Sequence, residues 1–440
     1  MLTVAARVPL PITHAVVLAT PGPDEAGGPG RGPAAPALDP LTQVAGLPLA
    51  LRAVLTLQKE GIARAYLVVA PGDARTGAAV LGDPRVRIPV EVLQAASRRE
   101  GLARALEAGA PLLVAAAEVI ADPALYRDLA AAPLGDALAA LAWRDGAALG
   151  PLVAAPALGA ALAGHAGAPL ELALLELRAE GRAVIVDAGA RWAFRADEPE
   201  GRRRATGALF EACRKPVDGL VSRHLNRHVS LFLSRRLVGT SVTPNAMSVY
   251  TFLLAVAAAL AVARGDYAGM LAGAALFQAN SILDGVDGEL ARVRFQQSKT
   301  GQWLDTVSDD LSTLIFYAGL IAGVQGAPFA RELSLSGYLA MGALTLTSLQ
   351  YYTELIRLGS GDFYALEWSF VEGAGGTAWA KVVRFFSLLL KKDFFIFLYL
   401  ALAAANLLPL ALVIGLAGHL IALGAACART LRRWGAGRRA

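Results

Sequence analysis

The chain has 440 residues, of which 55% are hydrophobic and only 18% are charged. It is too long for one ordinary domain and too apolar for a purely soluble protein, so we expect a membrane portion. Lys and Arg number 41 against 36 Asp and Glu, an excess too small to indicate a nucleic-acid-binding protein, and no nucleic-acid partner is expected.

The first two hundred residues predict a soluble α/β domain. A Gly- and Pro-rich loop is expected over residues 21–36, and a helix is expected over residues 49–60, ending at Gly61. Short apolar runs indicate buried strands at residues 16–19, 66–69, 112–114 and 183–186. Because these strands alternate with helices, we expect a mainly parallel sheet that is covered on both faces.

The N-terminus and the cysteines indicate a cytoplasmic setting for this domain. Pro9, Pro11 and His14 interrupt the apolar residues that a signal peptide would need. Cys213 and Cys427 are too few and too far apart for a disulfide framework or a zinc cluster. We therefore expect the first domain to face a reducing cytosol.

Residues 220–237 have the pattern of an amphipathic helix. Apolar residues recur at helical spacing, and four arginines lie between them, at Arg223, Arg227, Arg235 and Arg236. This pattern favours a helix that lies at an anionic bilayer surface. The alternative is a soluble helix that closes the first domain.

Six apolar segments follow that are long enough, or nearly long enough, to span a bilayer. They cover residues 246–263, 267–283, 306–324, 335–356, 393–407 and 408–427. Basic residues are concentrated after the second, fourth and sixth segments, at Arg292, Arg294, Lys299, Arg357, Lys381, Arg384, Lys391, Lys392, Arg429, Arg432 and Arg433. Because basic residues gather on the cytoplasmic side, we expect a multi-pass protein of the inner (cytoplasmic) membrane with both termini in the cytoplasm.

Two pairs of aspartates lie at helical spacing around the connection between the second and third segments. Asp284 and Asp287 are three residues apart, so they share one face of a helix. Asp305 and Asp309 are four residues apart and share one face of the next helix. Two antiparallel helices can therefore bring four carboxylates to one point.

Four convergent carboxylates repel one another and are costly near a bilayer, so they call for cations. Oxygen ligands suit Mg2+, Mn2+ or Ca2+, and the absence of nearby His or Cys argues against zinc. Two such ions can clamp a pyrophosphate and stabilise the attacking and leaving oxygens of phosphoryl transfer. Gly288, Ala291 and Gly301 leave room for a ligand, and Arg292 can donate to phosphate oxygens.

The same residues carry a resemblance to a known family. The sequence reads Asp284-Gly285-Val286-Asp287-Gly288-Glu289-Leu290-Ala291-Arg292, then eight residues, then Gly301-Gln302-Trp303-Leu304-Asp305-Thr306-Val307-Ser308-Asp309. It matches D-x-x-D-G-x-x-A-R, eight residues and G-x-x-x-D-x-x-x-D at every fixed position, and so resembles the CDP-alcohol phosphotransferases. The resemblance extends from about Val217 to the C-terminus, and the family is known for six membrane helices.

This resemblance implies a role for each matching residue. Two Mg2+ or Mn2+ ions would be held by Asp284, Asp287, Asp305 and Asp309. Asp309 would also act as the general base on the acceptor hydroxyl. The CDP pocket would be lined by Gly288, Ala291, Arg292, Thr300 and Gly301. Attack on the β-phosphorus of a CDP-alcohol would then transfer its phosphoalcohol group and release CMP.

Two acidic residues and one helix start near this motif need separate interpretations. Glu289 and Asp310 lie about 100° around their helices from their neighbours at the site, so we expect structural or solvated positions for both. Thr243-Pro244-Asn245 resembles a Pro-Asn pair of the family. The same pattern marks an ordinary helix start, which we favour.

An acceptor that carries phosphate needs cations as well. Arg357, Lys391 and Lys392 lie at the expected cytoplasmic helix ends, where an acceptor pocket can form. The positive-inside bias alone would also place basic residues there, so both interpretations stay open.

The first domain resembles the sugar-phosphate nucleotidyltransferases, which have a Rossmann-like α/β fold. The corresponding segments are residues 17–19, 39–41, 46–49 and 197–200. The sequence departs from that family in a long insertion ending near Arg31, in Asp39 where a lysine is expected, and in Glu118 where a metal-binding Asp is expected. Because triphosphate chemistry needs a tight backbone cradle and cations, we expect that this domain has lost nucleotidyl transfer.

We therefore expect three parts. They are a nucleotidyltransferase-like domain over residues 1–205, a linker with a juxtamembrane helix over 206–240, and a six-helix transmembrane domain over 241–440. The fusion resembles bifunctional proteins that make CDP-inositol from inositol phosphate and then form di-myo-inositol phosphate phosphate. Inositol phosphate or a related polar alcohol is then a reasonable acceptor.

Two alternatives remain open at this point. A CDP-diacylglycerol-type donor would make the protein a phospholipid synthase. In a different class, the aspartates would form the cation pathway of a membrane transporter, although transport sites usually lie near the bilayer midplane. The family resemblance also favours a homodimer formed through the membrane helices, surrounded by membrane lipids.

Overall fold

The computed structural model describes residues 12–20, 39–164, 168–215, 218–359 and 391–437. The loop expected over residues 21–36 and the basic residues Lys381 and Arg384 lie outside these ranges. The chain divides into two compact units, Ala6–Leu209 and Phe210–Ala440. Each unit has its own core and is described by itself.

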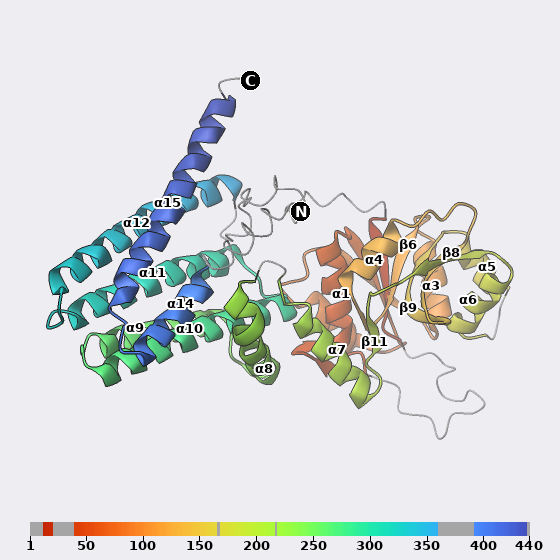
Figure 1. Ribbon diagram of the computed structural model, residues 1–440. Coiled ribbons are helices and arrows are strands. Elements are labelled where there is room, and N and C mark those ends of the chain that lie inside the picture. The colour runs from red at the N-terminus through yellow and green to blue at the C-terminus, as the bar shows by residue number, and fades with distance from the viewer. Residues whose placement is uncertain (1–11, 21–38, 165–167, 216–217, 360–390, 438–440) are drawn as a thin grey trace. The chain divides into compact units, whose positions relative to one another are not determined.

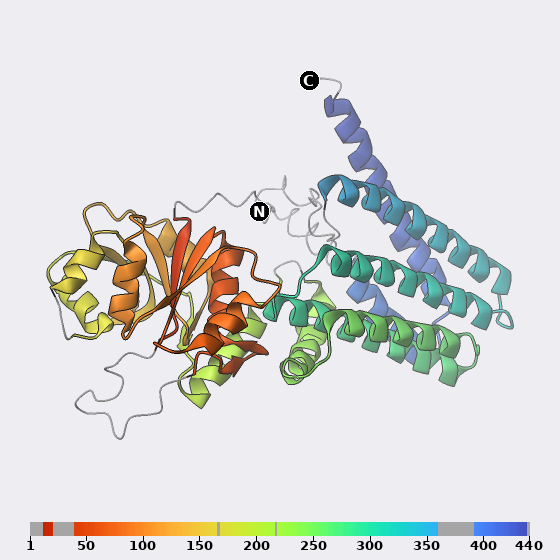
Figure 2. The same ribbon diagram turned by 180° about the vertical axis from the view of Figure 1, so that it is seen from behind.

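The first unit is built on a seven-stranded sheet with the order β10-β8-β9-β6-β1-β4-β5. Figure 2 shows this sheet with helices packed beside it. Its strands are β1 (His14–Leu18), β4 (Arg64–Val69), β5 (Val90–Gln94), β6 (Leu112–Ala116), β8 (Ala139–Arg144), β9 (Ala147–Ala154) and β10 (Ala183–Asp187). Strand β9 is antiparallel to both of its neighbours, and the other pairings are parallel. The prediction of a mainly parallel sheet is therefore confirmed.

Helices cover both faces of this sheet. The helices are α1 (Leu49–Glu60), α2 (Ala74–Leu81), α3 (Arg98–Leu106), α4 (Pro123–Ala130), α5 (Leu158–Ala163), α6 (Leu170–Ala179) and α7 (Pro199–Glu211). Val16 and Leu18 of β1 belong to a buried cluster with side chains of α3, α5 and α6, while α1 and α4 contact the sheet and each other. Helix α1 ends as predicted, because Gly61 takes the left-handed conformation with φ of 106°.

Two short antiparallel pairs complete the first unit. Strand β2 (Gln43–Val44) pairs with β3 (Leu47–Pro48) through a turn at Ala45 and Gly46, both with positive φ. Strand β7 (Val119–Ala121) pairs with β11 (Ala193–Arg195) beside the main sheet. Neither pair was predicted, since each strand has only two or three residues and its partner is set by tertiary contacts.

The second unit is helical (Figure 1). It contains a π-helical turn η1 (Ser222–Asn226) and the helices α8 (Arg227–Leu237), α9 (Pro244–Val262), α10 (Tyr267–Val293), α11 (Lys299–Gly323), α12 (Ala330–Leu358), α14 (Lys392–Ala404) and α15 (Leu410–Gly437). The six predicted apolar segments fall in α9 to α12, α14 and α15. Close packing is possible because Gly319 of α11 lies directly against the backbone of Ala259 in α9.

Two helices in the described chain are long and apolar enough to cross a membrane, over Pro244–Val262 and Leu410–Leu431. The predicted count of six spans is therefore not confirmed, although all six predicted segments fall in helices of the described chain. Helix α14 has 13 residues, and at about 1.5 Å per residue it is shorter than a hydrocarbon core of about 30 Å. Helices α10 to α12 mix apolar residues with polar and charged ones.

The helix predicted over residues 220–237 is present and belongs to the second unit. Its buried face is polar and packs on α10 through Asn226, Arg227, Ser230 and Ser234. Its exposed face carries Leu225, Val229 and Phe232, with the Arg236 guanidinium 4.3 Å above the Phe232 ring. The helix therefore packs within the second unit, and its place at a bilayer surface stays a prediction.

Candidate active site

Three of the four predicted aspartates form one cluster. Asp284 and Asp287 come from α10 and Asp305 comes from α11, and carboxylate oxygens of the three lie within 4.8 Å of one another. Helix α10 continues to Val293, so both of its aspartates stand on regular helix beyond the apolar stretch. The structure thus brings the two halves of the motif together.

The fourth aspartate lies beside this cluster and has a cationic partner. Lys392 Nζ, at the start of α14, donates to Asp309 Oδ1 at 2.8 Å and to the Asp309 carbonyl oxygen at 2.9 Å. Lys392 was predicted to bind an acceptor. The structure places its ammonium group at the candidate general base.

Hydrogen-bond donors orient Asp287 within the cluster. Ser248 Oγ of α9 donates to Asp287 Oδ2 at 2.5 Å, and the Gly288 N–H donates to Asp287 Oδ1. Ser248 is buried and was not predicted, because a serine inside an apolar helix gives no signal in the sequence. Only the packing of α9 on α10 reveals its role.

The predicted glycines leave space that polar groups border. A Cβ on Gly288 would lie 3.0 Å from Arg292 Nη1, so the guanidinium folds back over this glycine. A Cβ on Gly301 would lie 3.0 Å from Ser298 Oγ and 3.4 Å from Asn245 Oδ1. The side chain of Asn245 therefore lies beside the second half of the motif.

The segment Thr243-Pro244-Asn245 also starts a helix, as we favoured. Thr243 is the N-cap of α9, and its side chain accepts a hydrogen bond from the Ala246 N–H at 3.2 Å. Thr243 caps the helix and Asn245 lies beside Gly301, so the two features do not compete for one side chain.

The aspartates of the cluster raise one another's pKa, because each negative charge makes a second one nearby less favourable. Burial, and then the charges of Asp309 and Asp305, raise the pKa of Asp284 well above its usual range. Burial and the charge of Asp284 raise the pKa of Asp287, and burial with Asp287 and Asp309 raises that of Asp305. A divalent cation would reverse this effect. The donor set of oxygens alone fits Mg2+ or Mn2+.

Arg292 has a neighbour that the sequence did not suggest. The Cys213 thiol hydrogen-bonds with the Arg292 side chain. Burial raises the pKa of this thiol, and the positive charge of Arg292 offsets only part of that rise. Cys213 precedes helix 220–237 in the chain. This segment therefore reaches the predicted CDP-binding residues.

The remaining predicted residues lie at the ends of α11, α12 and α14. Thr300 is exposed in the first turn of α11, next to Ser298, which caps that helix by accepting from the Gly301 N–H at 2.9 Å. Arg357 is exposed in the last turn of α12, and no described contact joins it to the aspartates. Lys391 is half-buried, and burial lowers its pKa. The negative charges of Asp393 and Asp218 offset only part of this lowering.

Glu289 and Asp310, which were predicted to point away from the site, both contact neighbouring helices. Glu289 is fully buried and accepts hydrogen bonds from Arg227, Ser230 and Ser234 of α8 at 2.6 to 2.7 Å. Asp310 accepts a hydrogen bond from the Tyr352 hydroxyl of α12 at 2.6 Å. Both side chains therefore tie neighbouring helices to the two that carry the motif.

In the first unit, Glu118 has protein partners. It is buried after β6, and its carboxylate forms an ion pair with Arg98 at 2.9 Å. Arg98 also donates to the Thr20 carbonyl oxygen after β1 and to Glu171. Asp39 accepts from the Leu41 N–H and lies 3.8 Å from an Arg75 nitrogen. Both carboxylates therefore have protein partners, and the loss of nucleotidyl transfer stays a prediction.

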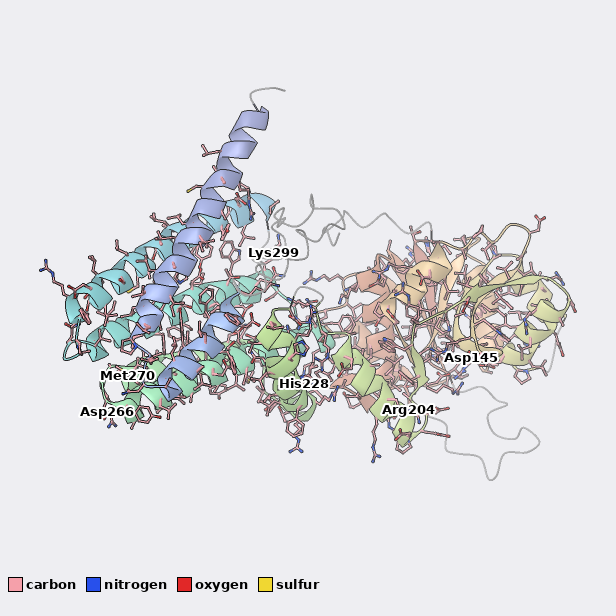
Figure 3. The ribbon with its side chains drawn as sticks, viewed as in Figure 1. Asp145, Arg204, His228, Asp266, Met270 and Lys299 are labelled. Atoms are coloured by element: carbon pink, nitrogen blue, oxygen red, sulfur yellow. The ribbon has the colours of Figure 1, made fainter. Side chains whose placement is uncertain are left out.

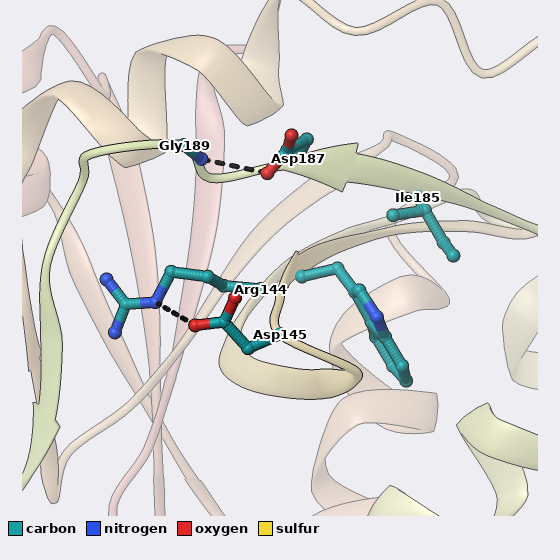
Figure 4. Close-up of a pocket in the computed structure, with 6 residues that line it drawn as sticks. Arg144, Asp145, Ile185, Asp187 and Gly189 are labelled. Carbon is teal, nitrogen blue, oxygen red and sulfur yellow. Dashed lines mark hydrogen bonds and ion pairs between the residues drawn. The ribbon is translucent and has the colours of Figure 1, made fainter.

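The first unit also has an open pocket at the carboxyl ends of β8 and β10 (Figure 4). Its lining residues are Trp143, Arg144, Asp145, Ile185, Asp187 and Gly189. Asp187 accepts from the Gly189 N–H, and Asp145 lies 3.7 Å from Arg144 Nε. Both carboxylates therefore already have local partners.

Comparison with known families supports the interpretation of the motif. Residues 241–361 match the family model described as CDP-alcohol phosphatidyltransferase. The match includes α9 to α12 and all four aspartates. The predicted resemblance is confirmed over residues 241–361, a shorter range than the sequence suggested.

Curated relatives match part of the chain. A bifunctional IPC transferase and DIPP synthase of Thermococcus kodakarensis is 45% identical over 115 residues, covering 26% of this chain and 25% of that protein. The Archaeoglobus fulgidus protein of the same name is 34% identical over 173 residues, covering 39% and 34%. An archaetidylinositol phosphate synthase of Methanothermobacter thermautotrophicus is 40% identical over 72 residues, covering 16% and 35%. These alignments span between a quarter and about a third of each relative.

Solved structures resemble the chain more remotely. The inositol-1-phosphate CTP transferase from T. maritima is 15% identical with a TM-score of 0.34, covering 43% of this chain and 91% of that one. A Mycobacterium tuberculosis phosphatidylinositol phosphate synthase in complex with manganese and citrate is 20% identical with a TM-score of 0.34, covering 46% and 87%. Each alignment leaves more than half of this chain without a counterpart.

Proposed function

We propose that this protein is a metal-dependent CDP-alcohol phosphotransferase. The observation that carries the proposal is the cluster of Asp284, Asp287 and Asp305, with Asp309 beside it, inside the matched region. Three carboxylates within 4.8 Å of one another can supply the oxygen ligands that a divalent cation prefers. Mg2+ or Mn2+ bound by these aspartates would neutralise the pyrophosphate of the donor.

The residues around the cluster have distinct roles in this reaction. The Asp309 carboxylate takes the proton of the acceptor hydroxyl, and the acceptor oxygen then bonds to the β-phosphorus of the CDP-alcohol. The bond between this phosphorus and the bridging oxygen breaks, and the oxygen leaves with CMP. Arg292, folded over Gly288, donates to phosphate oxygens, while Gly288 and Gly301 admit the donor between α10 and α11.

Two substrate classes are supported to different degrees. The bifunctional relatives favour a polar acceptor such as inositol phosphate. The relative named archaetidylinositol phosphate synthase favours a lipid donor as the second candidate. An acceptor phosphate would be bound by Lys391 and Lys392, together with Arg357 in the last turn of α12.

The membrane setting is part of the proposal. The exposed Leu225, Val229 and Phe232, with arginines beside them, suit the interface of an anionic bilayer. The distribution of basic residues supports an inner-membrane protein with both termini on the cytoplasmic side. The family resemblance further implies a homodimer through the membrane helices, which a mass measurement in lipid nanodiscs would test.

Incubation of the purified protein with a panel of CDP-alcohols and acceptors tests the function. We expect CMP release that requires both a donor and an acceptor, with inositol phosphate active as an acceptor. Release from CDP-diacylglycerol alone among the donors would favour the phospholipid synthase. Absence of CMP release with every pair, from protein that is folded and loaded with Mg2+, would contradict the proposal.

The variant Asp309→Asn tests the assignment of the general base. The amide keeps the shape of the side chain and an oxygen that can accept from Lys392, but it cannot take a proton. We expect donor binding to persist while CMP release falls by a factor on the order of a hundred. Turnover at the wild-type rate would show that another group is the base.

The first unit is expected to add no cytidylyltransferase activity, because Glu118 is paired with Arg98 and Asp39 carries the wrong charge for phosphate. The test uses the full-length chain with Asp305→Ala, so that the membrane reaction does not interfere. It is given CTP with inositol phosphate or sugar phosphates. We expect no pyrophosphate above background. Clear pyrophosphate release would refute the expectation.

A further inference from the structure

Two consecutive residues at the start of α14 connect separate parts of the helical unit. Lys392 reaches Asp309 on α11, with the two hydrogen bonds described above. Asp393 contacts a different helix, because its Oδ2 accepts a hydrogen bond from the Ser222 N–H at 2.7 Å. Ser222 lies in the first turn of helix 220–237. The start of α14 is thus held between that helix and the candidate base.

The contact of Asp393 with this helix is closely fitted. Gly219 lies so near the Asp393 carboxylate that a Cβ at this position would overlap both of its oxygens. The first N–H groups of a helix have no partners within the helix and carry partial positive charge, so a carboxylate placed there is stabilised. Asp393 supplies such a carboxylate from a residue that is 171 positions away from Ser222.

Helix 220–237 is in turn fixed to α10, which carries Asp284 and Asp287. Glu289 of α10 accepts from Arg227 at 2.7 Å, and Arg227 also pairs with Asp218 at 3.0 Å. Arg294 donates to the carbonyl oxygens of Leu237 and Val238, where the helix ends. These buried bonds make the helix a firm base for the docking of Asp393.

We propose that Asp393 is a positioning residue of the phosphotransfer site. By docking α14 on the start of helix 220–237, it directs the Lys392 ammonium group onto Asp309. The direction of a long lysine side chain depends on where its backbone is held, and Asp393 is the next residue. This inference rests on the proposed function, because Asp309 matters only if it takes part in the reaction.

A double-mutant cycle with Lys392 tests this role. We expect Asp393→Ala to lower kcat by about tenfold and to change KM for the donor by less than about twofold. In a Lys392→Ala background, the same change is expected to lower kcat by less than about twofold further, since the two residues act through one contact. Asp393→Asn keeps an oxygen that accepts from Ser222, so it should recover kcat to within about threefold of the wild type.

Asp266→Ala is the matched control. Asp266 also caps a helix, by accepting from the Gly269 N–H at 2.6 Å. It lies at the start of α10 (Figure 3). Asp284 and Asp287 lie in the other half of that helix. We expect this variant to keep the wild-type kcat. The inference would be overturned if Asp393→Ala lowered kcat by the same factor in the wild type and in Lys392→Ala. It would also be overturned if Asp266→Ala lowered kcat as much as Asp393→Ala does.

Hydrogen exchange gives a readout that does not depend on turnover. Peptides that contain Ser222 should exchange faster in Asp393→Ala than in the wild type, and at the wild-type rate in Asp266→Ala. Unchanged exchange in Asp393→Ala would also overturn the inference. If the wild type released no CMP, the proposed function would fail, whereas the exchange comparison would still decide whether Asp393 docks α14.

Discussion

Removal of divalent metal with EDTA is expected to reduce CMP release to background. The reason is electrostatic, because Asp284, Asp287 and Asp305 place carboxylate oxygens within 4.8 Å of one another. At this separation, and at an effective dielectric constant of about 20, each pair of unit charges repels by roughly 3–4 kcal/mol. Without cations the cluster therefore becomes protonated or repels the donor pyrophosphate.

The control for this experiment is the addition of metal after EDTA. Mg2+ or Mn2+ in excess should restore CMP release, whereas K+ at the same ionic strength should not, because oxygen clusters of this kind need a compact divalent ion. A thermal melt before and after EDTA shows whether the fold survives. Full turnover in excess EDTA would exclude a metal-dependent reaction.

Asp305→Ala is expected to reduce CMP release by about a thousandfold, while Asp310→Ala reduces it by less than about threefold. The two residues are five positions apart on α11, so their side chains point about 140° apart around the helix. Asp305 joins the carboxylate cluster, and Asp310 accepts from the Tyr352 hydroxyl instead. Loss of Asp305 leaves the cations short of a ligand, so most of the transition-state stabilisation is lost.

The thermal stability of the two variants should follow the opposite order. Asp310→Ala leaves the Tyr352 hydroxyl without its acceptor, which costs about 1.5–3 kcal/mol for a bond to a charged group. Asp305→Ala removes a carboxylate that its neighbours repel, so the metal-free protein should keep or gain stability. Equal losses of CMP release in both variants, with equal melting temperatures, would mean that the faces of α11 have been assigned wrongly.

Local patterns predicted those parts of the molecule that depend on neighbouring residues. The end of α1 at Gly61 follows from the left-handed conformation that glycine favours. The convergence of Asp284, Asp287 and Asp305 follows from steps of three and four residues on two successive helices. Both features are set within about twenty-five residues of sequence, so they could be found without the fold.

Contacts between distant segments could not be predicted in this way. Lys392 and Asp309 are 83 residues apart, and the position of α14 decides that they meet. Arg294 was counted only as a loop charge, yet it is buried and donates to the carbonyl oxygens of Leu237 and Val238. Strands β8 and β9 were missed because their alanine-rich sequences are compatible with helix as well as strand.

The most direct test of the proposed reaction follows the β-phosphorus of the donor. The wild-type protein is incubated with Mg2+, an acceptor and a CDP-alcohol that carries a radioactive label at this phosphorus. The account predicts that the label moves to the acceptor product, that unlabelled CMP appears in equal amount, and that neither forms with Asp305→Ala. Label that stays with the nucleotide as CDP, or transfer at an equal rate by Asp305→Ala, would contradict it.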